Sequence, residues 1–157
     1  MLKRKGWDPV NSPLLEKETR AWVQAYSKLD QLPVAWQEPR SGGTMGAPDC
    51  WLPSKHGGRV GIELKLGWPD EGNVCFTMRP AQIRYHHVAA KAGDRTAILV
   101  SVVHMNKLLW RALLPGNDCP KSTDARVHCS RMLNTSRWDE FLTAINCDLL
   151  WQPSLAF

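Results

Sequence analysis

Three charged residues have the types and spacing that phosphodiester hydrolysis requires. Asp49 follows Pro48, while Glu63 and Lys65 stand two residues apart in the run Ile62-Glu63-Leu64-Lys65. Side chains alternate between the two faces of a strand, so Glu63 and Lys65 point one way and their apolar neighbours point the other way. Because a core strand normally excludes both charges, this pair predicts a site at which the charges are used.

A hairpin is expected to bring the two carboxylates together. The segment around Gly57-Gly58 predicts a turn that places Asp49 beside Glu63. Two carboxylates at one sheet edge repel each other, and magnesium or manganese, which prefer such hard oxygen ligands, would remove that repulsion. A divalent ion can activate water and stabilise charge on a phosphate, and Lys65 would orient the water or neutralise the phosphate. The alternative is an exposed edge strand that carries a Glu–Lys pair and a loop aspartate.

The elements that must position these residues follow from the apolar pattern and from proline and glycine signals. The predicted helices begin at Ser12, at Arg79 or Pro80, and at Ser136 or Arg137, and they end at Leu29, Ala92 and Ile145. The predicted strands are Val34–Trp36, Pro48–Pro53, Arg59–Leu66, Thr96–Val103 and Lys107–Leu114. Loops are expected at Gly67–Asn73 and along the polar segment Pro115–Ser130.

This order of elements predicts an α/β fold, with a mixed central sheet flanked by helices. The length of 157 residues fits one domain. The nearly continuous apolar run Thr96–Val103 is typical of a central strand that is buried on both faces.

Two motifs resemble a known nuclease superfamily. Gly46-Ala47-Pro48-Asp49 followed by Gly58-Arg59-Val60-Gly61-Ile62-Glu63-Leu64-Lys65 resembles the core motif of the PD-(D/E)xK nucleases. Arg79-Pro80-Ala81-Gln82 at a helix start resembles the VRR-Nuc branch, which has a glutamine early in the helix after the E-x-K strand. Archaeal Holliday-junction resolvases and phage junction endonucleases share this core. The resemblance spans roughly Pro13 to Val103 and implies a single-domain restriction-endonuclease-like core, αβββαβ in order, with a C-terminal extension.

The resemblance also implies roles for individual residues. Asp49, Glu63 and the carbonyl of Leu64 would hold Mg²⁺ or Mn²⁺. Lys65 would be the catalytic lysine, and Gln82 would support the site from the second helix. An exposed helix amide is the alternative interpretation of Gln82.

Members of the superfamily usually carry a further acidic residue on the first helix. The expected apolar stripe of that helix is Leu15, Thr19, Trp22, Tyr26 and Leu29. Glu18 borders this stripe and is therefore the predicted catalytic acid, whereas Glu16 points further away and is the second choice. A solvated helix charge is the alternative for either residue.

The charge balance agrees with a nucleic-acid partner. Lysine and arginine number 20 against 15 aspartate and glutamate, which gives a net charge of +5. The predicted DNA-phosphate contacts are Arg40, Lys55, Arg59, Arg79 and Arg84, for which ordinary surface charge is the alternative. Among the eight tryptophans, Trp68 in a predicted loop could stack on an extruded base, although packing is the commoner role of tryptophan.

The expected organisation is a basic arm at 1–11, a nuclease core at 12–103 and an extension at 104–157. The apolar tail Leu149–Phe157 either packs on its own domain or meets a partner subunit in a homodimer. No apolar stretch approaches the roughly 18 residues of a membrane helix, and no signal-peptide core follows the basic start, so a cytoplasmic protein with no membrane partner is expected.

These expectations together predict a metal-dependent endonuclease acting on DNA, with selectivity for branched DNA such as junctions. The alternatives are a restriction-type or nicking nuclease on duplex DNA, or a non-catalytic DNA-binding module with the same fold.

Overall fold

The structure, a computed structural model, describes residues 13–37, 46–55 and 57–151, with the side chains of 13–16 and 149 excepted. Its helices are α1 (Pro13–Leu29), α2 (Pro80–Lys91) and α3 (Trp138–Ile145). Its strands are β1 (Ala35–Trp36), β2 (Cys50–Pro53), β3 (Arg59–Asp70), β4 (Asn73–Thr77), β5 (Arg95–His104), β6 (Lys107–Pro115), β7 (Asp124–His128) and β8 (Leu133–Asn134).

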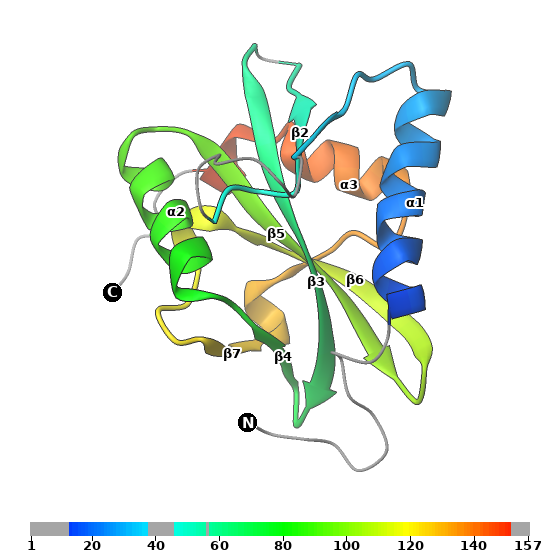
Figure 1. Cartoon of the computed structure of the whole chain (residues 1–157), viewed down its shortest axis with the longest axis vertical. Helices are drawn as coiled ribbons and strands as arrows, with labels where there is room; N and C mark the ends of the chain where they lie inside the picture. The colour runs from blue at the N-terminus through cyan, green and yellow to red at the C-terminus, as the bar shows by residue number, and fades with distance from the viewer. Residues whose placement is uncertain (1–12, 38–45, 56, 152–157) are drawn as a thin grey trace.

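All eight strands form one mixed sheet with helices on both faces (Figure 1). The main order is β1-β2-β3-β5-β6-β8, and β4 pairs with β3 and β7 beside it. The pair β3–β5 is parallel and the other pairs are antiparallel. Strand β5 is buried along Thr96–Val103, which confirms the predicted central strand. None of the helices in the described residues combines the length and the apolarity that crossing a bilayer requires.

Two apolar layers enclose the sheet. On one face, Ile83 of α2 packs with Ile98 and Val100 of β5. On the opposite face, Val23 of α1 and Phe141 of α3 share one apolar cluster. Successive side chains of β5 point to opposite faces, so they pack against α2 on one face and against α1 and α3 on the other. Figure 1 shows these helices on either side of β3.

The predicted loop at Gly67–Asn73 is wrong, because β3 continues to Asp70 and turns directly into β4. The turn residues Glu71 and Gly72 have φ values of 48° and 79°. Positive φ at both central residues is the geometry of a tight hairpin whose twist matches its strands. Strand β4 then pairs with β7, which lies inside the segment predicted to be an irregular polar stretch.

Helix α1 has its predicted length, but a different side of it faces the sheet. Thr19, Val23 and Ser27 are buried, whereas Tyr26 and Leu29 are 42% and 76% exposed. Thr19 joins the sheet through a 2.6 Å hydrogen bond between its Oγ1 and Oγ of Ser101. Small polar residues therefore face the sheet, and hydropathy alone misplaces the buried stripe.

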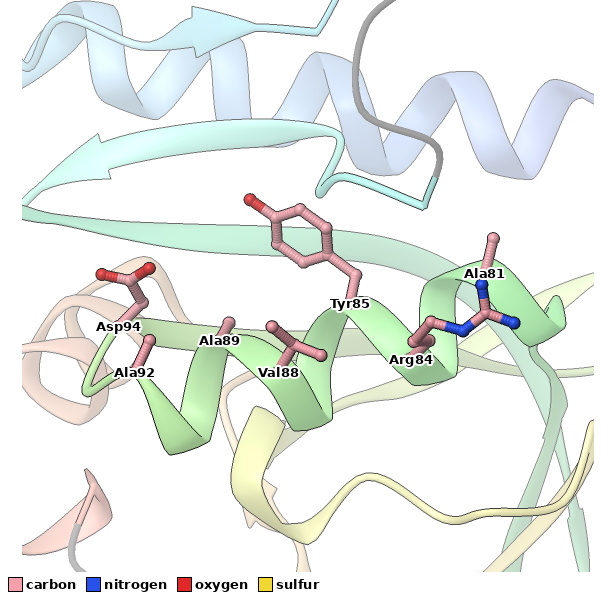
Figure 2. A pocket seen from close by; sticks show the side chains of 7 residues that line it. All are labelled: Ala81, Arg84, Tyr85, Val88, Ala89, Ala92 and Asp94. Carbon is pink, nitrogen blue, oxygen red and sulfur yellow. The ribbon is translucent and has the colours of Figure 1, made fainter.

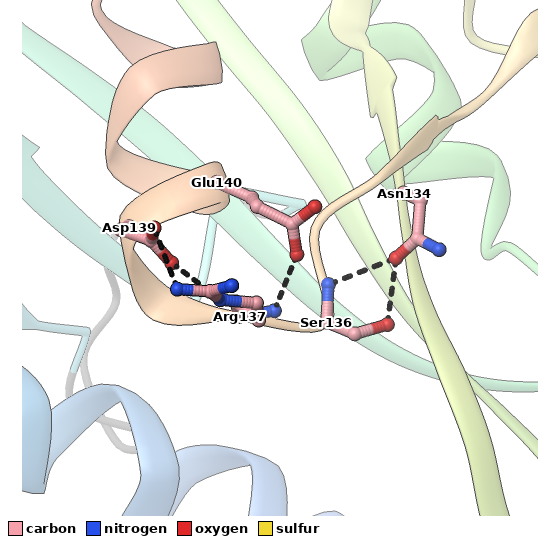
Figure 3. Close-up of polar contacts among 5 residues, drawn as sticks. All are labelled: Asn134, Ser136, Arg137, Asp139 and Glu140. Atoms are coloured by element: carbon pink, nitrogen blue, oxygen red, sulfur yellow. Dashed lines mark hydrogen bonds and ion pairs between the residues drawn. The ribbon is translucent and has the colours of Figure 1, made fainter.

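Helix α3 begins in a compact set of polar contacts (Figure 3). Asn134 Oδ1 accepts hydrogen bonds from the Ser136 amide at 3.1 Å and from its hydroxyl at 2.7 Å. Glu140 Oε1 accepts from the Arg137 amide at 3.0 Å. These bonds satisfy groups that the helix itself leaves unpaired, and they hold α3 at its predicted position.

The C-terminal extension completes the same sheet and core. Strands β6 and β8 continue the sheet beyond β5, and α3 belongs to the core on the α1 side. Leu150 and Trp151 also pack against that core, so the first part of the tail packs on its own domain. The remaining tail residues, 152–157, lie outside the described residues.

Candidate active site

Asp49 and Glu63 meet where β2 begins beside β3. The antiparallel register pairs Cys50 with Ile62, so the next step places Asp49 opposite Glu63. The Oδ2 atom of Asp49 accepts a 2.7 Å hydrogen bond from the backbone N–H of Leu64. The Asp49 carboxylate thus bonds the β3 backbone just before the first residue of β2, and this hydrogen bond fixes its position.

The carbonyl of Leu64 faces the same side as its N–H, because both groups of one residue point to one edge of a strand. This edge borders a hollow of about 220 Å³ that is lined by Lys17, Arg20, Asp49 and Leu64. One carboxylate and one backbone carbonyl therefore lie beside an open volume at the sheet edge.

Glu63 is almost fully buried, with 2% of its surface exposed. Its Oε1 accepts a 2.6 Å hydrogen bond from Nε2 of Gln82, whereas its buried Oε2 has no hydrogen-bond donor among the described residues. Burial, followed by the negative charge of Asp49, raises the pKa of Glu63 to about 8. Burial also raises the pKa of Asp49, although the Leu64 bond and the charge of Lys65 oppose that shift.

Gln82 of α2 connects the other groups of the site. Its Oε1 accepts hydrogen bonds from Nζ of Lys65 at 2.8 Å and from the Arg79 amide at 2.9 Å. The Lys65 ammonium also lies 3.9 Å from Oε1 of Glu63. The predicted residues Asp49, Glu63, Lys65 and Gln82 are therefore brought together. Alternation along β3 and the hairpin predicted the first three, whereas Gln82 was implied by the family resemblance.

A divalent cation fits these groups. The buried Glu63 and the half-buried Asp49 both have raised pKa values and need a positive charge between them, and the Oε2 of Glu63 is an acceptor without a donor among the described residues. Among the described residues, no cluster of three or more His, Cys, Asp or Glu side chains forms around the pair. Two side-chain ligands and the Leu64 carbonyl are thus what this part of the chain offers.

The structure does not bring Glu18 to the carboxylate pair. Glu18 is exposed, and its charge acts on Arg111. The choice of Glu18 depended on the predicted apolar stripe, which differs from the observed one. Glu16 stands three residues before the buried Thr19 and one turn before Arg20, which lines the hollow, so its backbone position is on the sheet-facing side of α1.

The predicted DNA contacts are spread over the surface. Lys55, Arg79 and Arg84 are exposed, and Arg40 lies outside the described residues. Arg79 is close enough for its charge to lower the pKa of Glu63 against the larger effect of burial. Arg84 lies along a separate hollow of about 360 Å³ on α2 (Figure 2), whose lining includes Val88.

Sequence reasoning missed the basic residues of α1 and misplaced one tryptophan. Lys17 and Arg20 line the hollow beside Asp49, and only the observed orientation of α1 reveals this. Trp68 is 5% exposed within β3, so it is unavailable for stacking on a base. Trp36 and Trp51 instead each lie under an arginine side chain.

One solved structure gives a comparison for the whole arrangement. Hjc, a Holliday junction resolvase from the archaeal hyperthermophile Archaeoglobus fulgidus, matches with a TM-score of 0.50 over 75% of this chain and 93% of that chain. The chain has the fold of that resolvase. Sequence identity is 8%, so the likeness concerns the fold alone. A scan of protein-family models and a search of curated proteins both find no match.

Proposed function

We propose that this protein is a metal-dependent endonuclease that hydrolyses DNA phosphodiester bonds, with branched DNA such as junctions as its substrate. The observation that carries the proposal is the buried Glu63 carboxylate beside Asp49, whose Oε2 has no hydrogen-bond donor within the described part of the chain. A fold that serves only to bind DNA has no need of a buried and a half-buried carboxylate that both have raised pKa values. The fold shared with a junction resolvase supports the choice of branched DNA.

The residues of the chain have separable roles in this proposal. Asp49, Glu63 and the carbonyl of Leu64 would hold Mg²⁺ or Mn²⁺. When bound, the ion supplies positive charge to the phosphate and lowers the pKa of a water molecule. Lys65, held by Gln82 at 2.8 Å, contributes a second positive charge at a fixed position.

The chain is proposed to act as a homodimer, because one active site makes one incision and paired cuts across a junction need two. The exposed Lys55, Arg79 and Arg84 would contact phosphates, together with Arg40. A positive net charge of +5 favours this partner. Localisation in the cytoplasm stays a prediction.

Incubation with fluorescent four-way junction, flap, single-stranded and linear duplex DNA tests the proposal. Cleavage of the junction is expected in magnesium or manganese, and binding without cleavage is expected in calcium. Glu63→Gln, Asp49→Asn and Lys65→Ala should each lower cleavage by about 10³-fold or more while the fold persists. Wild-type cleavage by any of these variants would contradict the site assignment, and binding without cleavage in every metal would favour a non-catalytic module.

The acid of the first helix is tested by a matched pair of variants. The observed side of α1 that faces the sheet favours Glu16, so Glu16→Gln should lower cleavage more than Glu18→Gln does. Both substitutions remove one charge from the same helix, and each therefore controls for the other. A larger effect at Glu18 would restore the original sequence-based choice.

A further inference from the structure

We propose that two arginine–tryptophan pairs, Arg20–Trp36 and Arg59–Trp51, bind DNA phosphates on the two sides of the carboxylate pair. This inference rests on the proposed function, since it assumes that DNA lies across Asp49 and Glu63. It assigns a use to two of the tryptophans and to Arg20, which was not predicted as a DNA contact, and it gives the predicted contact Arg59 an aromatic partner.

The first pair joins α1 to β1. The Arg20 guanidinium lies 4.2 Å from the centre of the Trp36 ring, and Arg20 also lines the hollow beside Asp49. Its positive charge reaches Asp49 and opposes the rise of the pKa of that carboxyl. Trp36 pairs with Cys50 in the β1–β2 register and packs on the α1 side of the sheet.

The second pair lies on the opposite face. The Arg59 guanidinium is 4.0 Å from the centre of the Trp51 ring. The ring lies over Gly61, where an added Cβ would come within 2.8 Å of it. The ring can pack there because Gly61 has no side chain. Arg59, Gly61 and Glu63 share one face of β3 by alternation, which aligns this pair with the carboxylate.

Both arginines are held in place and still carry an available charge. An aromatic face orients a guanidinium without neutralising it, and leaves the N–H donors at its edge available for phosphate. Neither Arg20 nor Arg59 has an ion-pair partner among the described side chains. By contrast, Arg95, Arg126 and Arg137 each lie within 4.0 Å of a carboxylate.

The spacing suits a DNA backbone. Glu63 follows Arg59 by four positions along β3, which is about 13 Å at the usual rise of a strand. This distance exceeds the rise between successive phosphates of one B-DNA strand, about 3.4 Å along the helix axis, so Arg59 would contact a different phosphate from the one at the carboxylates. Arg20, which lies beside Asp49, would contact the phosphate nearest the site.

Binding of a fluorescent four-way junction in calcium, measured by anisotropy at several salt concentrations, tests this assignment. Arg20→Gln and Arg59→Gln should each weaken binding by about tenfold and reduce the slope of log affinity against log salt by about 0.9. Arg95→Gln is the matched control: Arg95 also lies near a tryptophan, Trp151, but is ion-paired with Asp148. This variant should bind like the wild type.

The tryptophans are tested as positioning residues. Trp36→Leu and Trp51→Leu should weaken binding by about threefold although both arginines remain, and Trp36→Phe should restore part of the loss because an aromatic face returns. Thermal unfolding of each variant shows whether the fold persists. If the Trp36→Leu variant unfolds, the binding affinities and salt slopes of Arg20→Gln and Arg59→Gln still test the phosphate contacts.

The outcomes separate this inference from the proposed function. If the wild type cleaves junctions while Arg20→Gln and Arg59→Gln bind with wild-type affinity and salt slope, the phosphate assignment is overturned and the nuclease proposal stands. If the wild type never cleaves but both variants lose affinity as expected, the phosphate contacts stand and the nuclease proposal fails. Absence of DNA binding by the wild type would overturn both.

Discussion

The starts of α2 and α3 use the same local device with different consequences. At α2, the Arg79 amide donates to Oε1 of Gln82 at 2.9 Å. At α3, the Arg137 amide donates to Oε1 of Glu140 at 3.0 Å (Figure 3). In both helices a side chain in the first turn satisfies a backbone N–H that the helix leaves unpaired.

The difference lies in what else the capping side chain touches. Glu140 is exposed, and its described contacts stay within the first turn of α3. Gln82 also accepts from Lys65 and donates to Glu63, which belong to β3. An amide side chain accepts through its oxygen and donates through its nitrogen, which a carboxylate cannot do, so glutamine at this position connects a helix cap to the carboxylate of the site.

Of the changes that test this comparison, exchanging the capping residues, Gln82→Glu and Glu140→Gln, should separate the two helices most strongly in junction cleavage. Gln82→Glu keeps the acceptor for Arg79 but replaces the donor that lies 2.6 Å from Glu63 with a second carboxylate oxygen. Repulsion between the two carboxylates should lower junction cleavage by about 100-fold or more, measured under single-turnover conditions. The reciprocal change Glu140→Gln should leave cleavage unchanged. Equal behaviour of the two variants would show that Gln82 is a cap and nothing more.

An intermediate effect concerns the buried side of α2, one turn after Gln82. His86 is fully buried, and its Nδ1 lies 2.8 Å from Oγ1 of Thr96. Burial, then the charges of His87 and Lys65, lowers its pKa from 6.5 to about 4. As the pH falls, the His86 imidazole is therefore protonated in the unfolded chain before it is protonated in the folded one. The free energy of unfolding should fall by about 3 kcal/mol between pH 6.5 and pH 4.

Urea unfolding between pH 7 and 4.5 measures this loss. His86→Gln should flatten the dependence on pH, because glutamine does not titrate. The exposed His128 provides the control, and His128→Gln should retain the wild-type profile. A wild-type profile for His86→Gln would show that the buried ring does not control acid stability.

The smallest effect is expected at the α3 cap. Glu140→Ala removes the acceptor for the Arg137 amide and should lower the free energy of unfolding by about 1 kcal/mol. Cleavage should not change, because α3 contributes no described group to the site. Chemical denaturation and a junction assay on the same preparation measure both quantities. A cleavage loss at Glu140 would mean that α3 is coupled to the site.

Local patterns predicted most of the frame. Alternation along β3 separates Glu63 and Lys65 from Ile62, and the glycine turn pairs β2 with β3, so the meeting of Asp49 and Glu63 followed from spacing alone. The helix starts and the buried β5 also agree with their sequence signals. These features depend on contacts between residues close in sequence, or on a burial so complete that composition reveals it.

Other features were decided by partners distant in the chain. Strand β7 has only Ala125 and Val127 as buried residues, and it is a strand because β4 lies beside it. The rotation of α1 about its axis depends on Thr19 meeting Ser101, 82 residues later, which hydropathy does not indicate. That rotation determines that Lys17 and Arg20 border the hollow and that Glu18 does not.

The sequence by itself determined the two carboxylates and the lysine, because strand alternation fixes where such residues point, and it indicated the glutamine through the resemblance of its helix start to a nuclease motif. Only the tertiary structure decided what surrounds them. The buried Oε2 of Glu63, which no described residue donates to, and the arginines that lie over Trp36 and Trp51 arise from packing between separate elements. Burial and the distances between charges depend on residues far apart in the sequence, so the pKa shifts of Asp49 and Glu63 follow only from the packing of the sheet against its helices.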